Sequence, residues 1–243
     1  MKFLAKSALI ALCLSLNSLY AITGDEIIEK ADDLQSFDTQ TSSGTMISHD
    51  RFGDITSTFD SWSRGDKEFL LEFTNVEEAG QKVLRVDDTM YLYDPDAEET
   101  IRLSGSALKD SLFGDVSYED VSEGNDTLDK YYTSLEGTEL KKGQECYVVE
   151  LSAKQRTAPY YKQILWINKE SYVLVYGEYY SKRDVHLKTI EVLDYLEVDD
   201  KFVISHMILR DVIKGDSHTE LKLHDIKIDI ELEDRLFTEE ALF

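Results

Sequence analysis

The sequence has few thiols and few prolines: its 243 residues include two cysteines and two prolines. Cys13 lies in an N-terminal apolar run that we expect to be removed, which leaves Cys146 without a partner for an internal disulfide. Cys146 begins a strand-like Cys-Tyr-Val-Val run, which predicts a small buried side chain rather than a reactive thiol. Stability must therefore come from an apolar core, and this chain is long enough to bury one.

Basic residues are also scarce. The chain has 26 Lys and Arg against 49 Asp and Glu, a formal net charge of −23. Nucleic-acid binding and docking on an anionic lipid surface both depend on clustered Lys and Arg, so the composition excludes the first and argues against the second. The acidic residues are spread along the chain, which is typical of a well-solvated surface and requires no particular partner.

Long apolar runs are confined to the N-terminus. Residues 8–16 are apolar, follow two lysines and precede a stretch that ends in a small residue at position 21. This pattern predicts a secretory signal peptide over residues 1–21 and a single domain over residues 22–243. Lipidation of Cys13 is the alternative interpretation of the same segment. No later run approaches the ~20 residues of a membrane-spanning helix, so we expect no integral membrane segment.

Helical patterns are rare. Residues 25–37 place Ile27 and Leu34 on one face with acids in the first turn, which predicts an amphipathic helix. Most of the rest alternates as strands do, and the short polar turns between the runs require antiparallel neighbours. The strand-like runs cover residues 55–73 with a turn at Arg64-Gly65-Asp66, then 83–86, 90–93, 100–103, 131–140, 145–152, 160–168, 173–181, 186–198, 202–213 and 219–232.

The last of these runs changes the parity of its apolar residues. Leu221 and Leu223 occupy odd positions and Ile226 and Ile228 even ones, so a β-bulge near His224-Asp225 is needed to keep both halves on one core. Strongly curved sheets use such bulges. The predicted fold class is therefore mainly β (α+β): an incomplete antiparallel β-barrel or strongly curved sheet, covered by the N-terminal helix and a short helical lid.

The lid is predicted from the segment after Leu103. Ser104-Gly105-Ser106 interrupts the strand pattern, and apolar residues then recur at helical spacing. A curved sheet with such a cover is a natural container for an apolar ligand. Trp166 and the tyrosines of residues 160–195 either pack as ordinary strand residues or line this container. Candidate lipid-binding residues are Ile27, Leu34, Leu92, Leu108, Leu112, Phe113 and Trp166.

Motifs for chemistry are missing from the sequence. It has no GxSxG, HExxH, P-loop or dinucleotide-binding glycine pattern, and its five histidines are scattered. We therefore expect no catalytic residue, no metal site and no cofactor. Ser104 and Ser106 lie in a glycine-containing turn without a histidine nearby in sequence, which favours turn residues over nucleophiles. A lipid-acting hydrolase using either serine is the weakest of the functions considered.

Several short motifs follow one another along the chain in the order of a known family. They are Arg64-Gly65-Asp66-Lys67 and residues 69–74, 90–95, 103–106, 113–120, 146–151, 165–167 and 236–239. Together they resemble the LolA-like outer-membrane lipoprotein-sorting proteins of bacteria. The resemblance implies an incomplete β-barrel plugged by helices, located in the periplasm. It also implies a basic side chain that latches the lid, for which Arg85 and Arg102 are the candidates beside the cover segment.

Two functions fit this resemblance. The first is a monomeric periplasmic carrier that binds lipid or an acylated lipoprotein and exchanges it with donor and acceptor envelope proteins, without chemistry. The alternative is a non-catalytic interaction or sensor module of an envelope complex on the same fold. The two differ in whether the space under the lid is open to a ligand or filled by the chain's own side chains.

Overall fold

The computed structural model describes residues 22–122, 126–156 and 158–243, so the predicted signal peptide and Cys13 lie outside the described residues. The first element is α1 (Gly24–Leu34), three residues shorter at its C-terminal end than predicted. Thr23 and Glu26 form a capping box that fixes its start. The helix buries Ile27, Ile28 and Ala31 against the sheet, as its amphipathic pattern predicts.

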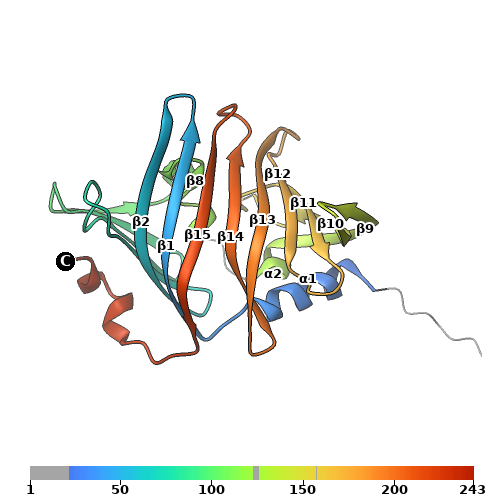
Figure 1. The fold of residues 1–243 in the computed structure, drawn as a ribbon, viewed down its shortest axis with the longest axis horizontal. Coiled ribbons are helices and arrows are strands. Elements are labelled where there is room, and N and C mark those ends of the chain that lie inside the picture. The colour runs from blue at the N-terminus through green and yellow to red at the C-terminus, as the bar shows by residue number, and fades with distance from the viewer. Residues whose placement is uncertain (1–21, 123–125, 157) are drawn as a thin grey trace, which may run out of the picture.

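A large antiparallel sheet forms most of the chain (Figure 1). The strand order β6-β5-β4-β3-β2-β1-β15-β14-β13-β12-β11-β10-β9 places β6 and β9 at the two edges, and pairing of β1 with β15 joins the early and late halves of the chain. The strands are β1 (Thr39–Asp50), β2 (Gly53–Arg64), β3 (Glu68–Phe73), β4 (Lys82–Val86), β5 (Thr89–Asp94), β6 (Glu99–Leu103), β9 (Tyr131–Lys141), β10 (Gln144–Ala153), β11 (Lys162–Asn168), β12 (Leu174–Tyr180), β13 (His186–Val198), β14 (Lys201–Asp211) and β15 (His218–Ile228). The prediction of antiparallel neighbours is confirmed at every pair.

The predicted bulge in the last strand is present. Thr41 pairs with Lys227 and Ser43 with His224, so β15 carries one more residue than β1 between these pairs. Asp225 has a φ of 52°, the left-handed backbone that a bulge of this kind uses. Leu221 and Ile226 consequently are both half-buried despite their opposite parity.

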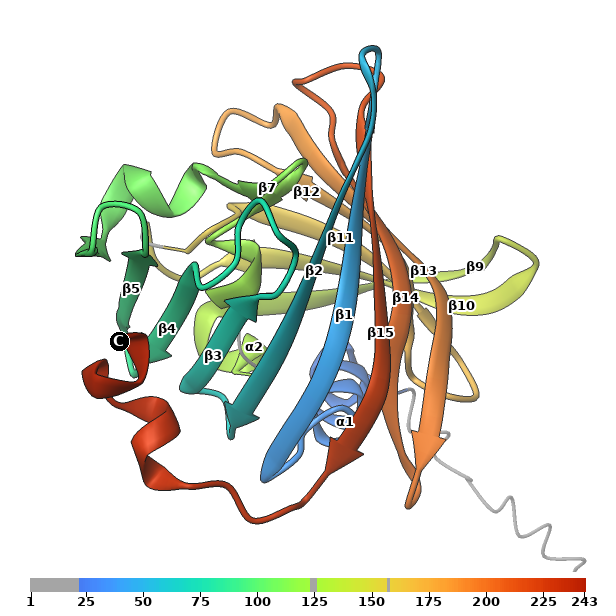
Figure 2. The ribbon, with the colours of Figure 1, turned by 60° about the vertical axis from the view of Figure 1, so that its left-hand side comes forward.

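The sheet curves around α1 and the segment after β6, which defines an inner and an outer face (Figure 2). The inner face carries two apolar clusters. The helix cluster joins α1 to β10–β12, and the lid cluster joins the segment after β6 to β1–β5 and β14. Smaller clusters on the outer face surround Cys146 and Leu84. Cys146 is fully buried, as its strand pattern predicts, and burial raises the pKa of its thiol.

The lid segment, defined as residues 104–122, differs from the prediction. Instead of a continuous helix it forms a short 3-10 helix η1 (Gly105–Lys109), a hairpin of β7 (Ser111–Phe113) and β8 (Val116–Ser117), and the 3-10 turn η2 (Asp120–Ser122). Leu112 and Phe113 thus lie on a strand. The reason is Gly114, whose φ of 55° turns the chain back within four residues. A short helix α2 (Thr127–Lys130) follows and contacts α1.

The C-terminal segment forms η3 (Asp234–Phe237) and η4 (Glu239–Leu242), which pack on the outer face of the early strands. Leu242 is fully buried against Leu70 and Leu84. Among the described residues, no helix has the length and apolar character needed to cross a membrane.

Candidate functional site

The inner face beneath the lid segment is an apolar floor. Met46, Phe59, Leu71 and Met90 point inward from β1, β2, β3 and β5 and are nearly fully buried. The lid covers this floor with its own apolar residues, including Phe113. The lid and floor therefore form a continuous apolar cluster whose halves come from separate parts of the chain.

Two cavities flank this cluster on the inner side of the sheet. The lid cavity, of about 440 Å³, lies between the lid segment, the start of β13, the β14–β15 turn and the segment around Tyr160. Its wall includes Val116, Leu187 and Ile213. The helix cavity, of about 300 Å³, lies between α1, α2 and strands β10–β12. Both volumes fall in the range of small-ligand sites, and both walls combine apolar residues with a few polar ones.

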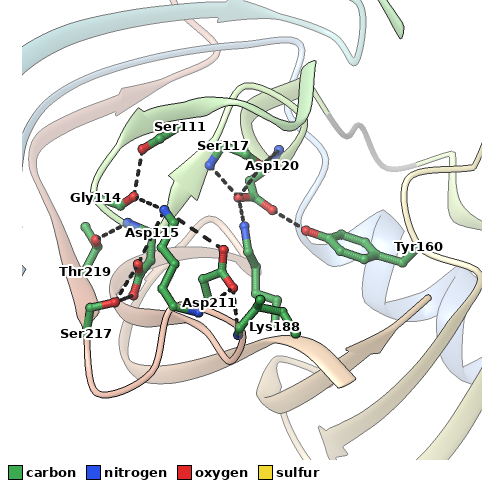
Figure 3. A network of polar contacts seen from close by, with 12 residues as sticks. Ser111, Gly114, Asp115, Ser117, Asp120, Tyr160, Lys188, Asp211, Ser217 and Thr219 are labelled. Carbon is green, nitrogen blue, oxygen red and sulfur yellow. Dashed lines mark hydrogen bonds and ion pairs between the residues drawn. The ribbon is translucent and has the colours of Figure 1, made fainter. Parts of the chain in front are cut away.

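A buried ion pair fastens the lid to the sheet (Figure 3). Lys188 of β13 is ion-paired with Asp120 at the end of the lid, and the two side chains are only 7% and 8% exposed. Asp120 also accepts hydrogen bonds from the Tyr160 hydroxyl at 2.7 Å and from the Ser117 hydroxyl and backbone N–H, each at 2.8 Å. We call Lys188, Asp120, Tyr160 and Ser117 the latch.

A second set of polar contacts holds the tip of the lid hairpin (Figure 3). The backbone N–H of Asp115 donates to Thr219 Oγ1 at 2.7 Å, and Ser217 donates to the Asp115 carboxylate at 2.9 Å. Lys214 Nζ donates to the Gly114 carbonyl at 2.7 Å. Asp115 is buried, so these bonds replace the water that its carboxylate loses. Polar contacts thus tie both the tip of the lid hairpin and the end of the lid segment to β13–β15.

Gly114 lets the hairpin tip come this close to the sheet. A Cβ at this position would lie 2.3 Å from Thr219 Oγ1 and 2.7 Å from Ser48 Oγ, and the φ of 55° strains any other residue. We expect Gly114→Ala to lower the free energy of unfolding by about 1–3 kcal/mol and to loosen the lid. Urea denaturation with hydrogen exchange checks this, and Gly215→Ala, with φ 96° but open space around its Cβ, controls for backbone strain alone. If both variants lose the same free energy of unfolding, the lack of space beside Thr219 and Ser48 is not the cause.

The predicted lining residues fall into two groups. Ile27 and Leu34 belong to the helix cluster, whereas Leu92, Leu108, Leu112 and Phe113 belong to the lid cluster. Trp166 lies in neither. It shows the opposite parity to Leu165 and Ile167 and packs on the outer face with Cys146, where its indole N–H donates to Glu139. The prediction that Trp166 lines the cavity was therefore wrong, because its side chain lies on the outer face of the sheet.

The two arginines proposed as latches bond elsewhere. Arg85 faces inward, but its Nε donates to the carbonyl of Asp87 in the adjacent turn at 3.0 Å. Arg102 donates to Thr89 at 3.1 Å. The basic side chains that contact the lid hairpin and its end are Lys188 and Lys214. Sequence reasoning missed Lys188, although it shares its parity with the inward Ile190 and Val192 on β13, a signal of a buried lysine.

Burial also affects two carboxyl groups beside the cavities. It raises the pKa of Glu119, which lies in the wall of the lid cavity. It raises the pKa of Asp32, in the wall of the helix cavity, from 3.8 to about 7, although hydrogen bonds from Thr127 oppose the shift. Lys130 lines the same cavity and is ion-paired with Asp126 at 2.6 Å.

Asp32 makes a pH-dependent contribution to stability. Since its folded-state pKa lies above the usual value, its contribution is fully present below about pH 4 and is lost as the pH rises through about 7. We expect Asp32→Asn to stabilise the protein by about 1–2 kcal/mol at pH 8 and to change little at pH 4. Urea denaturation at both pH values checks this, with the exposed neighbour Asp33→Asn as control. A gain that is the same at both pH values would contradict the assignment.

The described residues offer little for chemistry. They contain no group of three or more His, Cys, Asp or Glu side chains that could hold a metal ion. Within the same part of the chain, the hydrogen bonds of the histidine rings go to Asp54, Lys188, Glu220 and Asp225, and none joins a histidine to Ser104 or Ser106. The arrangement is an apolar floor covered by the lid segment, which polar contacts hold in place.

Comparison with known proteins supports the fold. A family model described as "Uncharacterized protein" matches residues 65–243, and no curated protein matches the chain. A solved DUF1329 family protein from Desulfovibrio piger has a TM-score of 0.84 at 24% identity, covering 90% of this chain and 98% of its own. A domain from Vibrio parahaemolyticus, assigned by its description to outer membrane lipoprotein sorting, has a TM-score of 0.81 at 24% identity, covering 90% and 97%.

A LolA superfamily protein from Nitrosomonas europaea is similar as well, with a TM-score of 0.78 at 24% identity over 91% of this chain and 100% of its own. At this level of identity the likeness establishes the architecture. The chain therefore has the LolA-like fold that its sequence motifs indicated.

Proposed function

Since the chain belongs to the family whose model matches residues 65–243, and has the LolA-like fold, we propose that it is a periplasmic carrier of lipid or lipoprotein acyl chains. Similar structures described as lipoprotein-sorting or LolA superfamily proteins support this proposal. Fold alone does not fix function, so the decisive feature is what lies under the lid.

The observation that carries the proposal is the apolar floor under a lid fastened by polar contacts. Apolar side chains of the lid and floor, such as Phe113 and Phe59, shield each other from water while the lid is closed. When the lid opens, an acyl chain replaces the lid on the floor and the floor stays dry. The lid cavity beside the latch is the space in which the chain end first enters.

Release of the latch controls this exchange. The Lys188–Asp120 pair is buried, so it holds the lid in one place, yet opening requires no covalent step. Water and polar groups of a donor or acceptor envelope protein can solvate both charges once they separate. Each buried charge costs free energy when unpaired, so the latch closes again when cargo has left.

The alternative is an interaction or sensor module without cargo. One observation favours it: in the closed structure the lid's own residues, including Phe113 and Tyr118, cover the apolar floor and occupy the place of a ligand. In that function the lid would stay closed or respond to a partner protein, and no lipid would replace it.

Titration with a fluorescent fatty acid separates the two functions. A carrier binds the probe about once per chain, and Asp120→Asn, which removes the charge of the latch, speeds its uptake. Competition with a diacylated peptide and with a phospholipid then identifies the preferred cargo. If neither the wild type nor Asp120→Asn binds the probe, the carrier is excluded and the interaction module takes its place.

A further inference from the structure

The helix cavity takes no part in the exchange described above. It lies where α1 and α2 cover the inner face of the sheet (Figure 2), and its volume is about 300 Å³. At roughly 30 Å³ for each water-sized group, this volume holds on the order of ten heavy atoms. Much of its wall is apolar, with Ile28 of α1, Leu151 of β10 and Leu165 and Ile167 of β11. A small aliphatic molecule suits such a space, and the polar groups of the wall decide which head group it carries.

The wall contains two charged side chains, Asp32 and Lys130, which are not paired with each other. Lys130 is ion-paired with Asp126 instead, at 2.6 Å. The Asp32 carboxylate accepts a hydrogen bond from the Thr127 hydroxyl at 3.2 Å, but among the described residues it has no ion pair. The helix cavity therefore has a carboxylate in its wall without a cation beside it.

The surroundings of Asp32 favour a cation over an anion. Burial raises the pKa of Asp32, and the nearby acids Asp66 and Asp126 raise it further. A positive charge placed beside the carboxylate would oppose these effects, because it stabilises the charged form. A negative head group would add to the repulsion instead.

Gln163 of β11 supplies a second, independent polar group. It is only 5% exposed, shares the inward parity of Leu165 and Ile167, and forms part of the same wall. Within the part of the chain that the structure describes, its side-chain amide has no hydrogen-bond partner. Buried amides normally have one. The amide is thus available to a ligand, and its carbonyl oxygen can accept a hydrogen bond from an N–H group.

We propose that the helix cavity binds a small aliphatic amine in its ammonium form, with the ammonium group at Asp32 and Gln163 and the alkyl chain against the apolar wall. An ammonium group has a positive charge and three N–H donors, and a carboxylate and an amide carbonyl are suitable acceptors for them. An alcohol of the same length would fill the same space but leave Asp32 without a cation. The site is separate from the lid cavity, so the proposal goes beyond the carrier function and does not rest on it.

Isothermal titration calorimetry with n-octylamine and 1-octanol, which have equal numbers of heavy atoms, tests the class of ligand. At pH 8 the solution lies above the pKa of about 7 of Asp32, and an alkyl amine, like a lysine side chain, is protonated. The wild type is expected to bind octylammonium at least about tenfold more tightly than octanol. Equal affinities for the two probes, or no binding of octylammonium, would overturn the proposal.

Two variants at Asp32 and Asp33 test the carboxylate. Asp32→Asn is expected to weaken octylammonium binding at least about tenfold and to change octanol binding by less than about twofold. The matched control is Asp33→Asn, which removes the same charge from an exposed neighbour on α1 and is expected to bind both probes as the wild type does. If Asp33→Asn loses as much affinity as Asp32→Asn, the amine is attracted by the overall negative charge and the site is wrong.

Two further variants test the amide and the choice of cavity. Gln163→Leu is expected to weaken octylammonium binding about threefold without lowering the melting temperature, because an apolar side chain replaces an amide without a partner. Leu187→Trp, in the wall of the lid cavity, is expected to keep the octylammonium affinity of the wild type. A loss in Leu187→Trp would place the amine in the lid cavity and overturn the proposal. Fatty-acid binding reports the carrier function separately, so either proposal can fail without the other.

Discussion

Lys188→Met is expected to lower the free energy of unfolding by about 3–5 kcal/mol. The substitution keeps much of the length of the side chain but leaves the Asp120 carboxylate buried without its cation. The hydrogen bonds from Ser117 and Tyr160 remain and hold the effect near the lower end of this range. Urea denaturation measures the loss, and hydrogen exchange is expected to show it first in the lid segment.

Two further variants separate the latch from general damage. Lys214→Met removes a cation that is 43% exposed, so it should cost less than about 1 kcal/mol. The double variant Lys188→Met with Asp120→Asn removes both charges and should recover part of the stability that Lys188→Met loses. If the double variant is as unstable as the sum of the single ones, the ion pair is not coupled and the latch is wrong.

Leu187→Trp is expected to weaken fatty-acid binding at least about tenfold, or ~1.4 kcal/mol. Leu187 forms part of the wall of the lid cavity, and the larger indole would occupy space that the ligand needs. Because the cavity of about 440 Å³ can accommodate the added atoms, the melting temperature should change by only a few degrees.

Leu193→Trp is the matched control for this change. Leu193 lies on the same strand, β13, but is 46% exposed. It is expected to bind the fatty acid as the wild type does. Equal affinities for Leu187→Trp and Leu193→Trp would mean that the ligand does not use the lid cavity, whatever the protein binds elsewhere.

Most strands and α1 could be predicted because their signals are local, whereas the polar, Ser/Thr-rich β1 was not among the predicted runs. Alternation, short polar turns and the helical spacing of Ile27 and Leu34 each involve residues a few positions apart. The bulge at Asp225 could also be predicted. When the apolar residues of one strand change parity, a bulge is needed to keep them on the same face of the sheet. These signals gave the curved sheet and the covering helix.

The position of the lid could be predicted from the sequence, but its conformation could not. The spacing of Leu108, Leu112 and Phe113 fits a helix. The chain instead turns at Gly114, and the hairpin tip is held by hydrogen bonds between Asp115 and the side chains of Thr219 and Ser217. Contacts between residues more than one hundred positions apart set this geometry. The spacing of apolar residues within the lid segment does not reveal such contacts.

The latch and the position of Trp166 were missed for related reasons. Lys188 and Asp120 are 68 positions apart, and many other acidic residues could have been its partner. Around Trp166 the strand is apolar on both parities, so alternation does not distinguish the faces. Partners on other strands, Glu139 of β9 and Tyr176 of β12, fix Trp166 on the outer face.

Native mass spectrometry with lipid extraction tests the carrier function most directly. Protein purified from the periplasm of a Gram-negative cell is expected to carry about one phospholipid or acylated peptide per chain, and the Leu187→Trp variant is expected to carry less. A chain that is empty as purified, and that also fails to bind added fluorescent fatty acid, would contradict the carrier function.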